Sequence, residues 1–421
     1  MKSRSTHAWS VCLLLLAATM LNYMDRQVLS SSAVTVQKVL DFGDEKYGTL
    51  ESAFGISFAL GGLLFGWLVD RGVRVRWIYP VVVICWSASG MATSLVSSYA
   101  GLFLCRALLG FFESGHWPCA IWTTRSVLEP KDRPLGNGLL QSGAALGAIL
   151  TPIVLARLEV FNNWRLPFAV VGALGLFWVA AWIWMRADRA SLPGETPAVE
   201  PGSVLPPPPK SSFSALLHDR RLWLLVGLSA LFNLTWQFLR AWLPKLMEEA
   251  RGYTHEETLF LTALYFGAAD AGSILCGWGT RRLAVWIGIG AARKCSMLLC
   301  SLIVLLAIPA AHVGKGWGFE TMILLVGFGS LGIFPNFYSL TQELPAHHQG
   351  KITALTGLSA WLVASMAQPF AGRLNDELGK VRGYEINLTI AGTLPLLGMA
   401  FLLLSWRERK AEAQEAPRPT G

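Results

Sequence analysis

Residues 9–26 read WSVCLLLLAATMLNYMDR, an apolar run that ends in an acid beside a base. A helix of about 20 apolar residues is long enough to cross the roughly 30 Å hydrocarbon core of a bilayer. The run continues into the polar residues without a small-residue cleavage site, so we interpret it as a retained helix rather than a signal peptide. This stretch therefore predicts a membrane-spanning helix that carries Asp25 and Arg26.

Similar apolar stretches recur along the whole chain. Of its 421 residues, 53% are hydrophobic and 15% are charged, whereas soluble domains contain roughly 25% charged residues. Backbone groups in lipid must be paired within the segment, so long uniform runs indicate helices. We predict an all-α membrane protein with twelve transmembrane helices, near residues 9–36, 48–69, 77–97, 99–122, 136–157, 164–186, 220–243, 257–278, 290–311, 318–340, 350–373 and 384–406.

The basic residues gather in alternate loops, which accounts for the net charge of +8. Lys and Arg concentrate in the cytoplasmic loops of membrane proteins. This rule predicts a multi-pass protein of the cell inner membrane with both termini in the cytoplasm, and it gives no reason to expect a nucleic-acid partner. The clearest basic clusters are Arg71, Arg74 and Arg76, and then Arg281, Arg282, Arg293 and Lys294.

The longest polar interval, Ala187 to Ser214, contains the run Pro206 to Pro209. Such a composition favours an extended linker over packed structure. We therefore predict an N-terminal six-helix bundle at 1–186, a cytoplasmic Pro-rich linker at 187–214, a C-terminal six-helix bundle at 215–406 and a cytoplasmic tail at 407–421.

The two halves of the sequence repeat weakly. A shift of 211 residues aligns Gly61 to Trp67 with Gly272 to Trp278, and a shift of 217 aligns Gly110 and Phe111 with Gly327 and Phe328. Parallel repeats of six helices are typical of transporters whose halves rock against each other. Chance similarity between glycine-rich helices is the alternative.

The seven Cys residues lie singly, without a C-x-x-C or Cys/His spacing. We therefore expect no disulfide, no metal site and no cofactor.

Several local patterns resemble known transporter families. Gly66-x-Leu68-x-Asp70-Arg71 resembles the loop signature of the major facilitator superfamily, although its second glycine stands at 72 instead of 73. Four further patterns look like the anion:cation symporter family, which includes hexuronate and aldonate uptake systems. They are Asn22 to Arg26, Arg106 to Pro118, Trp242 to Pro244 and Ala269 to Gly272.

This resemblance implies alternating access around a cavity at the membrane midplane and a carboxylate substrate transported with protons. It assigns proton coupling to Asp25, Glu113 and Arg106. The candidate substrate-binding residues are Tyr23, Arg26, Gln141, Asn233, Gln237, Asn336 and Trp361.

An ionised side chain at the bilayer centre costs at least about 2.5–3.5 kcal/mol, so such residues should face a partner or a wet cavity. Arg106 and Glu113 are seven residues apart and share one helix face, about 10 Å apart along the axis. One hypothesis is that Glu113 carries a proton and that Arg106 biases its release. The alternative is that each side chain holds a neighbouring helix through hydrogen bonds.

Asp25 and Arg26 are about 100° apart on a helix, so one can face a helix interface while the other faces the substrate. The planar guanidinium of Arg26 suits a carboxylate. The alternative is a buried ion pair of Arg26 with Asp25 or another acid. In the second half, Asn233, Gln237, Asn336 and Trp361 would supply hydrogen bonds and apolar walls.

The sequence thus predicts a monomeric transporter in membrane lipid that takes up a small organic anion, such as a hexuronate or aldonate, with protons. An organophosphate:phosphate exchanger is the rival, because Arg26 and Arg240 could converge on a phosphate dianion. A polytopic membrane enzyme is a further alternative. It would need an acid-base, nucleophile or metal cluster at a membrane surface.

Overall fold

The computed structural model describes residues 2–128, 132–158, 163–187, 216–345 and 349–406, and the regular structure in these ranges is helical. The first half contains α1 (Lys2–Ser31), α2 (Ala33–Leu40), α3 (Asp44–Asp70), α4 (Val75–Thr93), α5 (Tyr99–Glu113), α6 (His116–Val127), α7 (Arg133–Leu158) and α8 (Leu166–Ala187). The second half contains α10 (Arg220–Lys245), the π-helical turn η2 (Leu246–Ala250), α11 (His255–Ile287), α12 (Ile289–Val304), α13 (Ala307–Ala310), α14 (Trp317–Gly332), α15 (Phe334–Thr341), α16 (Gln349–Leu378) and α17 (Lys380–Ser405).

The prediction of an all-α membrane protein is confirmed. Within the described residues, ten helical segments are long and apolar enough to cross a membrane. The other two predicted spans, near 99–122 and 350–373, fall on the α5–α6 pair and on α16. The total of twelve therefore stays a prediction.

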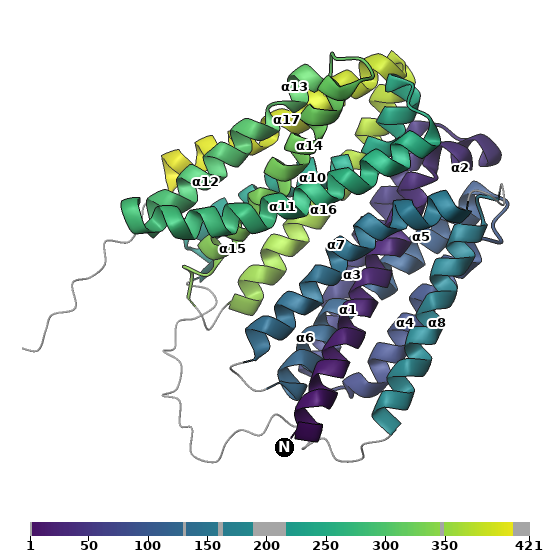
Figure 1. The fold of residues 1–421 in the computed structure, drawn as a ribbon, viewed down its shortest axis with the longest axis vertical. Coiled ribbons are helices and arrows are strands. Elements are labelled where there is room, and N and C mark those ends of the chain that lie inside the picture. The colour runs from purple at the N-terminus through teal and green to yellow at the C-terminus, as the bar shows by residue number, and fades with distance from the viewer. Residues whose placement is uncertain (1, 129–131, 159–162, 188–215, 346–348, 407–421) are drawn as a thin grey trace, which may run out of the picture.

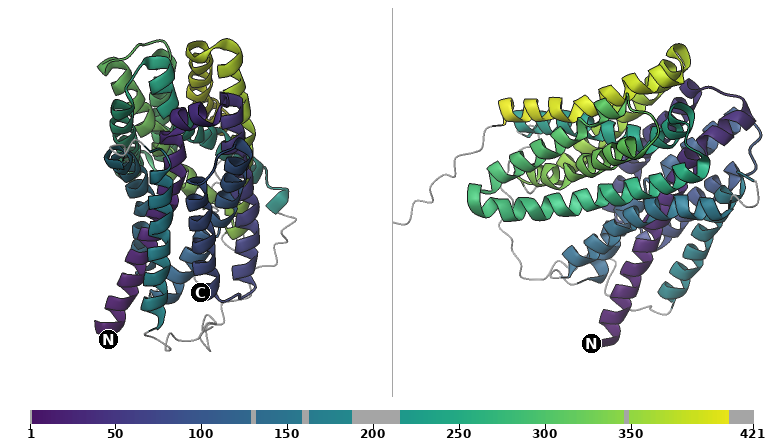
Figure 2. Two further views of the ribbon diagram at one scale, coloured as in Figure 1. Left: turned by 90° about the vertical axis from the view of Figure 1, so that its right-hand side faces the viewer. Right: turned by 45° about the horizontal axis from the view of Figure 1, so that its top comes forward.

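The helices form two groups that correspond to the two halves of the chain (Figure 1). The groups meet at the end where α2 lies, which we call the α2 end, and diverge toward the end that carries the N-terminus (Figures 1 and 2). Between the groups, α3 packs against α16 and α7 packs against α11. The predicted tail and nearly all of the predicted linker lie outside the described residues, so the domain boundaries remain predictions.

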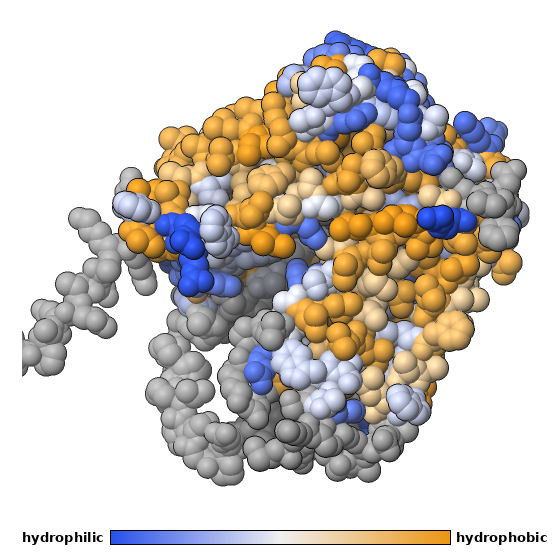
Figure 3. Space-filling view, in the orientation of Figure 1, coloured by the Kyte–Doolittle hydropathy of each residue, from blue (hydrophilic) through white to orange (hydrophobic). Residues whose placement is uncertain are grey.

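The outer surface suits a lipid environment. Apolar side chains cover much of the face shown in Figure 3, whereas strongly hydrophilic ones gather toward the ends of the helices. Large apolar side chains are exposed on several helices, for example Phe177, Ile274, Trp286 and Leu404. Such broad apolar exposure is unfavourable in water but is expected where lipid tails are the solvent.

The sequence repeat corresponds to a repeated helix crossing. In the first half, a Cβ at Gly61 of α3 would lie 2.4 Å from the carbonyl oxygen of Phe111 of α5. In the second half, a Cβ at Gly272 of α11 would lie 2.0 Å from the carbonyl oxygen of Phe328 of α14. The two glycines are aligned in the repeat, and so are the two phenylalanines. Glycine lets the backbones approach this closely, so both halves are built around the same contact.

A short break divides the fourth span of the first half. Helix α5 ends at Glu113 and α6 begins at His116, after Ser114 and Gly115. The His116 ring lies within hydrogen-bond distance of two neighbours, with Nδ1 at 2.8 Å from the Tyr79 hydroxyl and Nε2 at 2.9 Å from the Thr19 hydroxyl. These contacts hold the start of α6 against α4 and α1, which fixes the position of Glu113 at the end of α5.

We predict that Gly272→Ala destabilises the folded protein, because the added methyl group must displace the backbone of α14. Overpacking of this kind costs about 1–3 kcal/mol. The measurement is the melting temperature of the purified protein in detergent. Gly267→Ala on the same helix is the matched control, because no atom lies within 4 Å of a Cβ at that position. Equal melting temperatures for the two variants would contradict the close crossing.

Candidate functional site

Six ionisable side chains form the centre of the candidate site. They lie on α1, α3, α5 and α10, and each is at most 5% exposed: Asp25, Arg26, Glu51, Arg106, Glu113 and Arg240. An ionised group shielded from water is costly unless a partner or a hydrogen bond compensates it. The contacts of these groups therefore show what each can do.

Arg26 forms an ion pair with Glu113. The Arg26 Nε donates to Glu113 Oε2 at 2.7 Å, and the Arg26 Nη2 donates to Asn22 Oδ1 at 2.7 Å. Asn22 and Arg26 are four residues apart on α1 and therefore share one face. Asn22 also donates from Nδ2 to the carbonyl oxygen of Glu113 at 3.4 Å. The other carboxylate oxygen of Glu113, Oε1, has no hydrogen-bond partner among the described residues.

Four aromatic rings surround the Arg26 guanidinium. Its central carbon lies 4.6 to 5.6 Å from the ring centroids of Phe58, Tyr23, Phe54 and Trp361. Trp361 belongs to α16 of the second half, so Arg26 lies where the two halves meet. Cation–π contacts of this kind stabilise the guanidinium without neutralising it. The structure thus places two further predicted residues, Tyr23 and Trp361, beside Arg26.

Asp25 faces in a different direction. A Cβ at Gly90 of α4 would lie 3.1 Å from Asp25 Oδ1, so the carboxyl group packs on the α4 backbone. Its Oδ2 is buried and has no hydrogen-bond partner among the described residues. The side chains of Asp25 and Arg26 therefore lie against different neighbours, in agreement with the 100° between consecutive residues of a helix.

Glu51 of α3 joins two arginines from different halves. Its Oε1 accepts from Arg106 Nη2 at 2.9 Å, and its Oε2 accepts from Arg240 Nη2 at 2.5 Å. Arg240 also donates from Nε to the side-chain oxygen of Gln237 at 2.7 Å. Arg106 is thus paired directly with Glu51, and its role in biasing proton release from Glu113 stays a prediction. The cation in direct contact with Glu113 is Arg26.

The ring of Phe54 connects the two groups. Its centroid lies 5.3 Å from the guanidinium carbon of Arg26 and 4.8 Å from that of Arg106. The two carbons are therefore at most 10.1 Å apart, the sum of these distances. Both arginines thus belong to one buried cluster.

Three further predicted substrate-binding residues, Asn233, Gln141 and Asn336, lie in different surroundings. Asn233 donates from Nδ2 to the carbonyl oxygen of Ala360 at 3.0 Å and joins α10 to α16. Gln141 is exposed on α7. Asn336 contacts the hydroxyl groups of Thr280 at 3.0 Å and Ser296 at 3.1 Å.

Asn336 makes its side-chain hydrogen bonds to Thr280 and Ser296 and not to the six ionisable side chains of the candidate site. It lines a cavity of about 220 Å³ together with Arg281 and Arg293, two members of the basic clusters beside the α11–α12 connection. The role of Asn336 in substrate binding stays a prediction. Its amide holds α15 against α11 and α12, so a structural role accounts for its polar contacts.

Glu51 was missing from the predicted site. The predicted helix began at residue 48, which placed Glu51 near a membrane surface. In the structure α3 begins at Asp44, four residues earlier, and Glu51 is fully enclosed. The sequence did contain an indication of its position. Glu51 lies three residues after Gly48 and four before Gly55, so the three share one face of α3, and both glycines face the second half of the protein.

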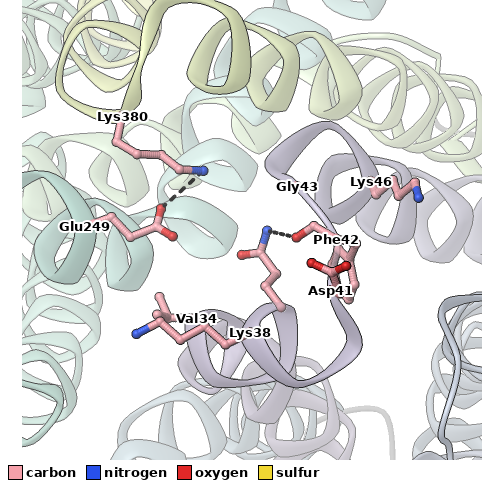
Figure 4. Close-up of a pocket in the computed structure, with 9 residues that line it drawn as sticks. Val34, Lys38, Asp41, Phe42, Gly43, Lys46, Glu249 and Lys380 are labelled. Carbon is pink, nitrogen blue, oxygen red and sulfur yellow. Dashed lines mark hydrogen bonds and ion pairs between the residues drawn. The ribbon is translucent and has the colours of Figure 1, made fainter.

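A second ionic network closes the α2 end. Asp44 is fully buried and accepts from Lys245 Nζ at 2.9 Å and from Lys380 Nζ at 2.8 Å. Lys245 also contacts Gln37 and Glu249. Figure 4 shows the adjoining cavity of about 450 Å³, with Glu249 and Lys380 on one side and the turn after α2 on the other. This network joins the two halves at the α2 end, through residues other than the six ionisable side chains of the candidate site.

Known proteins share both the sequence pattern and the fold. Residues 15–367 match the family model described as Major Facilitator Superfamily. The hexuronate transporter of Escherichia coli (strain K12) is 23% identical over 384 residues, which cover 88% of each chain. The probable L-galactonate transporter of the same strain is 25% identical and covers 93% of this chain and 88% of its own.

Solved structures support the fold. A bacterial homologue of the human lysosomal transporter Spinster superposes with a TM-score of 0.78 at 18% identity, over 94% of this chain and 96% of its own. A D-xylose-proton symporter superposes with a TM-score of 0.73 at 15% identity, over 94% of this chain and 97% of its own. The family match spans most of the chain, and the relatives are transporters rather than enzymes. The chain therefore belongs to the Major Facilitator Superfamily and is a multi-pass membrane transporter.

Proposed function

We propose that the protein takes up an organic carboxylate, a sugar acid such as a hexuronate or an aldonate, by proton symport with alternating access. The observation that carries the proposal is the buried ion pair between Arg26 and Glu113 beside the interface of the two halves. The relatives named as hexuronate and L-galactonate transporters support the substrate class. The inner membrane is the proposed location, with both termini in the cytoplasm.

The carboxylate of Glu113 and the carboxylate of the substrate compete for the same arginine. While Glu113 is ionised, it holds Arg26 at 2.7 Å. A proton on Glu113 removes this negative charge, so the guanidinium becomes available to the carboxylate of the substrate. Arg26 then remains paired in a region that excludes water, and the substrate anion and the proton enter together. Loss of the proton on the other side restores the pair with Glu113 and weakens substrate binding.

The surroundings of Arg26 suit a selective binding site. Phe54, Phe58 and Trp361 supply apolar walls, and Asn22 supplies an amide. Small-molecule sites commonly combine such walls with a few well-placed polar groups. The apolar walls also strengthen an ion pair with the substrate, because they lower the local dielectric.

Asp25 is the proposed second proton site. Its Oδ2 is buried without a partner, an environment that favours a neutral carboxyl over a carboxylate. The side chain packs on α4 and not on Arg26, so its proton would affect the buried charge of the site without direct contact to the substrate.

The described conformation is proposed to be closed toward the outside. The basic residues after α3 and after α11 favour a cytoplasmic location for the opposite end, so the α2 end is proposed to face outward. There Asp44 joins the first half to Lys245 and Lys380 of the second half. Alternating access would require this network to separate when the carrier opens to the outside.

The phosphate-exchange alternative is less well supported by the contacts. Arg26 and Arg240, the two groups that would hold a phosphate, are each paired with a carboxylate of the protein. A proton is the simplest agent to release such a pair. Competition of uptake by inorganic phosphate, together with insensitivity to a collapsed proton gradient, would reverse this preference.

We predict that Glu113→Gln abolishes proton-driven accumulation of D-galactonate but retains exchange across the membrane. Glutamine imitates the protonated carboxyl and cannot release a proton. The measurement compares uphill uptake with counterflow in sealed vesicles. Glu256→Gln, the same change at an exposed position of α11, should leave both activities unchanged. Normal uphill uptake by Glu113→Gln would rule out this role.

We predict that Arg26→Lys weakens D-galactonate binding by roughly 10–100-fold. Lysine keeps the positive charge but loses the planar pair of donors, and a charge-assisted hydrogen bond contributes about 1.5–3 kcal/mol. Isothermal titration of the purified protein measures this change. Arg382→Lys, at an exposed side chain beside Glu385, is the control. An unchanged affinity in Arg26→Lys would place the substrate carboxylate elsewhere.

A further inference from the structure

The buried cluster has more hydrogen-bond donors than its acids satisfy. Arg106 and Arg240 share the carboxylate of Glu51. Among the described residues, no partner accepts from Arg106 Nε, Arg106 Nη1 or Arg240 Nη1, although these atoms are buried. Each guanidinium carries five N–H donors, and a buried donor without an acceptor costs about 1–3 kcal/mol. These three unpaired donors on two neighbouring arginines indicate a place for an additional anionic group.

The charges of the cluster lead to the same conclusion. Three arginines face three acids, and the cluster is neutral when all six groups are ionised. When Asp25 and Glu113 carry the protons of the proposed symport, Glu51 is the one remaining negative charge. Three positive charges against one leave a net charge of +2. A monoanion would leave one of these charges uncompensated in a region shielded from water, whereas a dianion would neutralise the cluster.

The spacing of the arginines suits a short dianion. The guanidinium carbons of Arg26 and Arg106 are at most 10.1 Å apart, across the Phe54 ring. Five carbon–carbon bonds of about 1.5 Å place the ends of a six-carbon chain roughly 6 Å apart. The distance from each carboxylate carbon to the guanidinium carbon that it contacts adds to this length. A chain of up to six carbons can therefore reach both arginines.

We propose that the substrate is a dianion that binds Arg26 with one carboxylate and binds Arg106 and Arg240 with its second anionic group. This inference rests on the proposed function and narrows its substrate class. The second anionic group takes the place that Glu51 occupies in the described conformation. Glu51 is then a positioning residue that exchanges with the substrate on Arg240.

The location of Glu51 explains how the exchange is linked to transport. The same face of α3 packs on α16, where a Cβ at Gly48 would lie 2.2 Å from the carbonyl oxygen of Gln368. The Tyr47 hydroxyl also donates to the carbonyl oxygen of Ala241 at 2.9 Å. Separation of the halves at the α2 end would therefore remove Glu51 from Arg240 and leave this arginine open to the substrate. Closure would return Glu51 to Arg240 and displace the substrate toward the opposite side.

The test compares galactarate with D-galactonate, which share a six-carbon skeleton and differ in whether one end is a carboxylate or a hydroxymethyl group. Both are measured by isothermal titration with the purified full chain at a pH of about 5.5, where free carboxylates are ionised. Galactarate should bind at least about tenfold more tightly. Arg240→Gln should remove this difference, so that galactarate loses at least about tenfold more affinity than D-galactonate. Equal binding of both anions by the unmodified protein, or equal weakening of both by Arg240→Gln, would overturn the proposal.

Glu51→Gln separates exchange from structural support. It keeps both arginines and removes the competing charge, so the ratio of galactarate affinity to D-galactonate affinity should rise above that of the unmodified protein. A purely structural role would lower the melting temperature without changing the ratio of the two affinities. The control is Glu45→Gln, because Glu45 also pairs across the halves, with Arg373, but at an exposed position.

Failure of this inference differs from failure of the proposed function. Proton-driven accumulation of D-galactonate without preference for galactarate would overturn the dianion alone. Absence of binding and accumulation for both anions would overturn the proposed function and the dianion with it.

Discussion

The ion pair between Arg26 and Glu113 is the interaction on which the centre of this protein depends. Charge inside a membrane must be compensated locally, since no bulk water is present to solvate it. The break between α5 and α6 places Glu113 opposite α1, and the His116 contacts fix that position. In the proposed symport, a proton on Glu113 would release Arg26, so the same pair would provide both stability and a means of coupling.

The two halves share a scaffold but differ in chemistry. The glycine crossings at Gly61 and Gly272 show the same backbone contact twice. Five of the six ionisable groups of the cluster belong to the first half, whereas the second half contributes Arg240, along with Gln237 and Trp361 as uncharged neighbours. In the proposed mechanism, a repeated scaffold would let both halves move as similar bodies, and the asymmetric charges would confine proton binding mainly to the first half.

One face of α3 links the α2 end to the cluster of six buried ionisable side chains. Asp44, Tyr47 and Glu51 are spaced by three and four residues, so they lie on one side of the helix. Each of them contacts the second half, through Lys245, Ala241 and Arg240 respectively. Movement of this single face would therefore open the α2 end and change the partners of Arg240 in the same step.

The sequence by itself determined the class of protein and much of its local geometry. Apolar segments of membrane-spanning length predicted the helices, the loop and helix patterns predicted the superfamily, and the helical period predicted that Asp25 and Arg26 would diverge. Tertiary structure decided the ion partners. It paired Arg106 and Arg240, from different halves, with the carboxylate of Glu51, and it placed the amide of Asn336 against Thr280 and Ser296. The physical reason is that helical periodicity fixes the face on which a side chain lies, whereas its partner depends on which helix packs there and at what height.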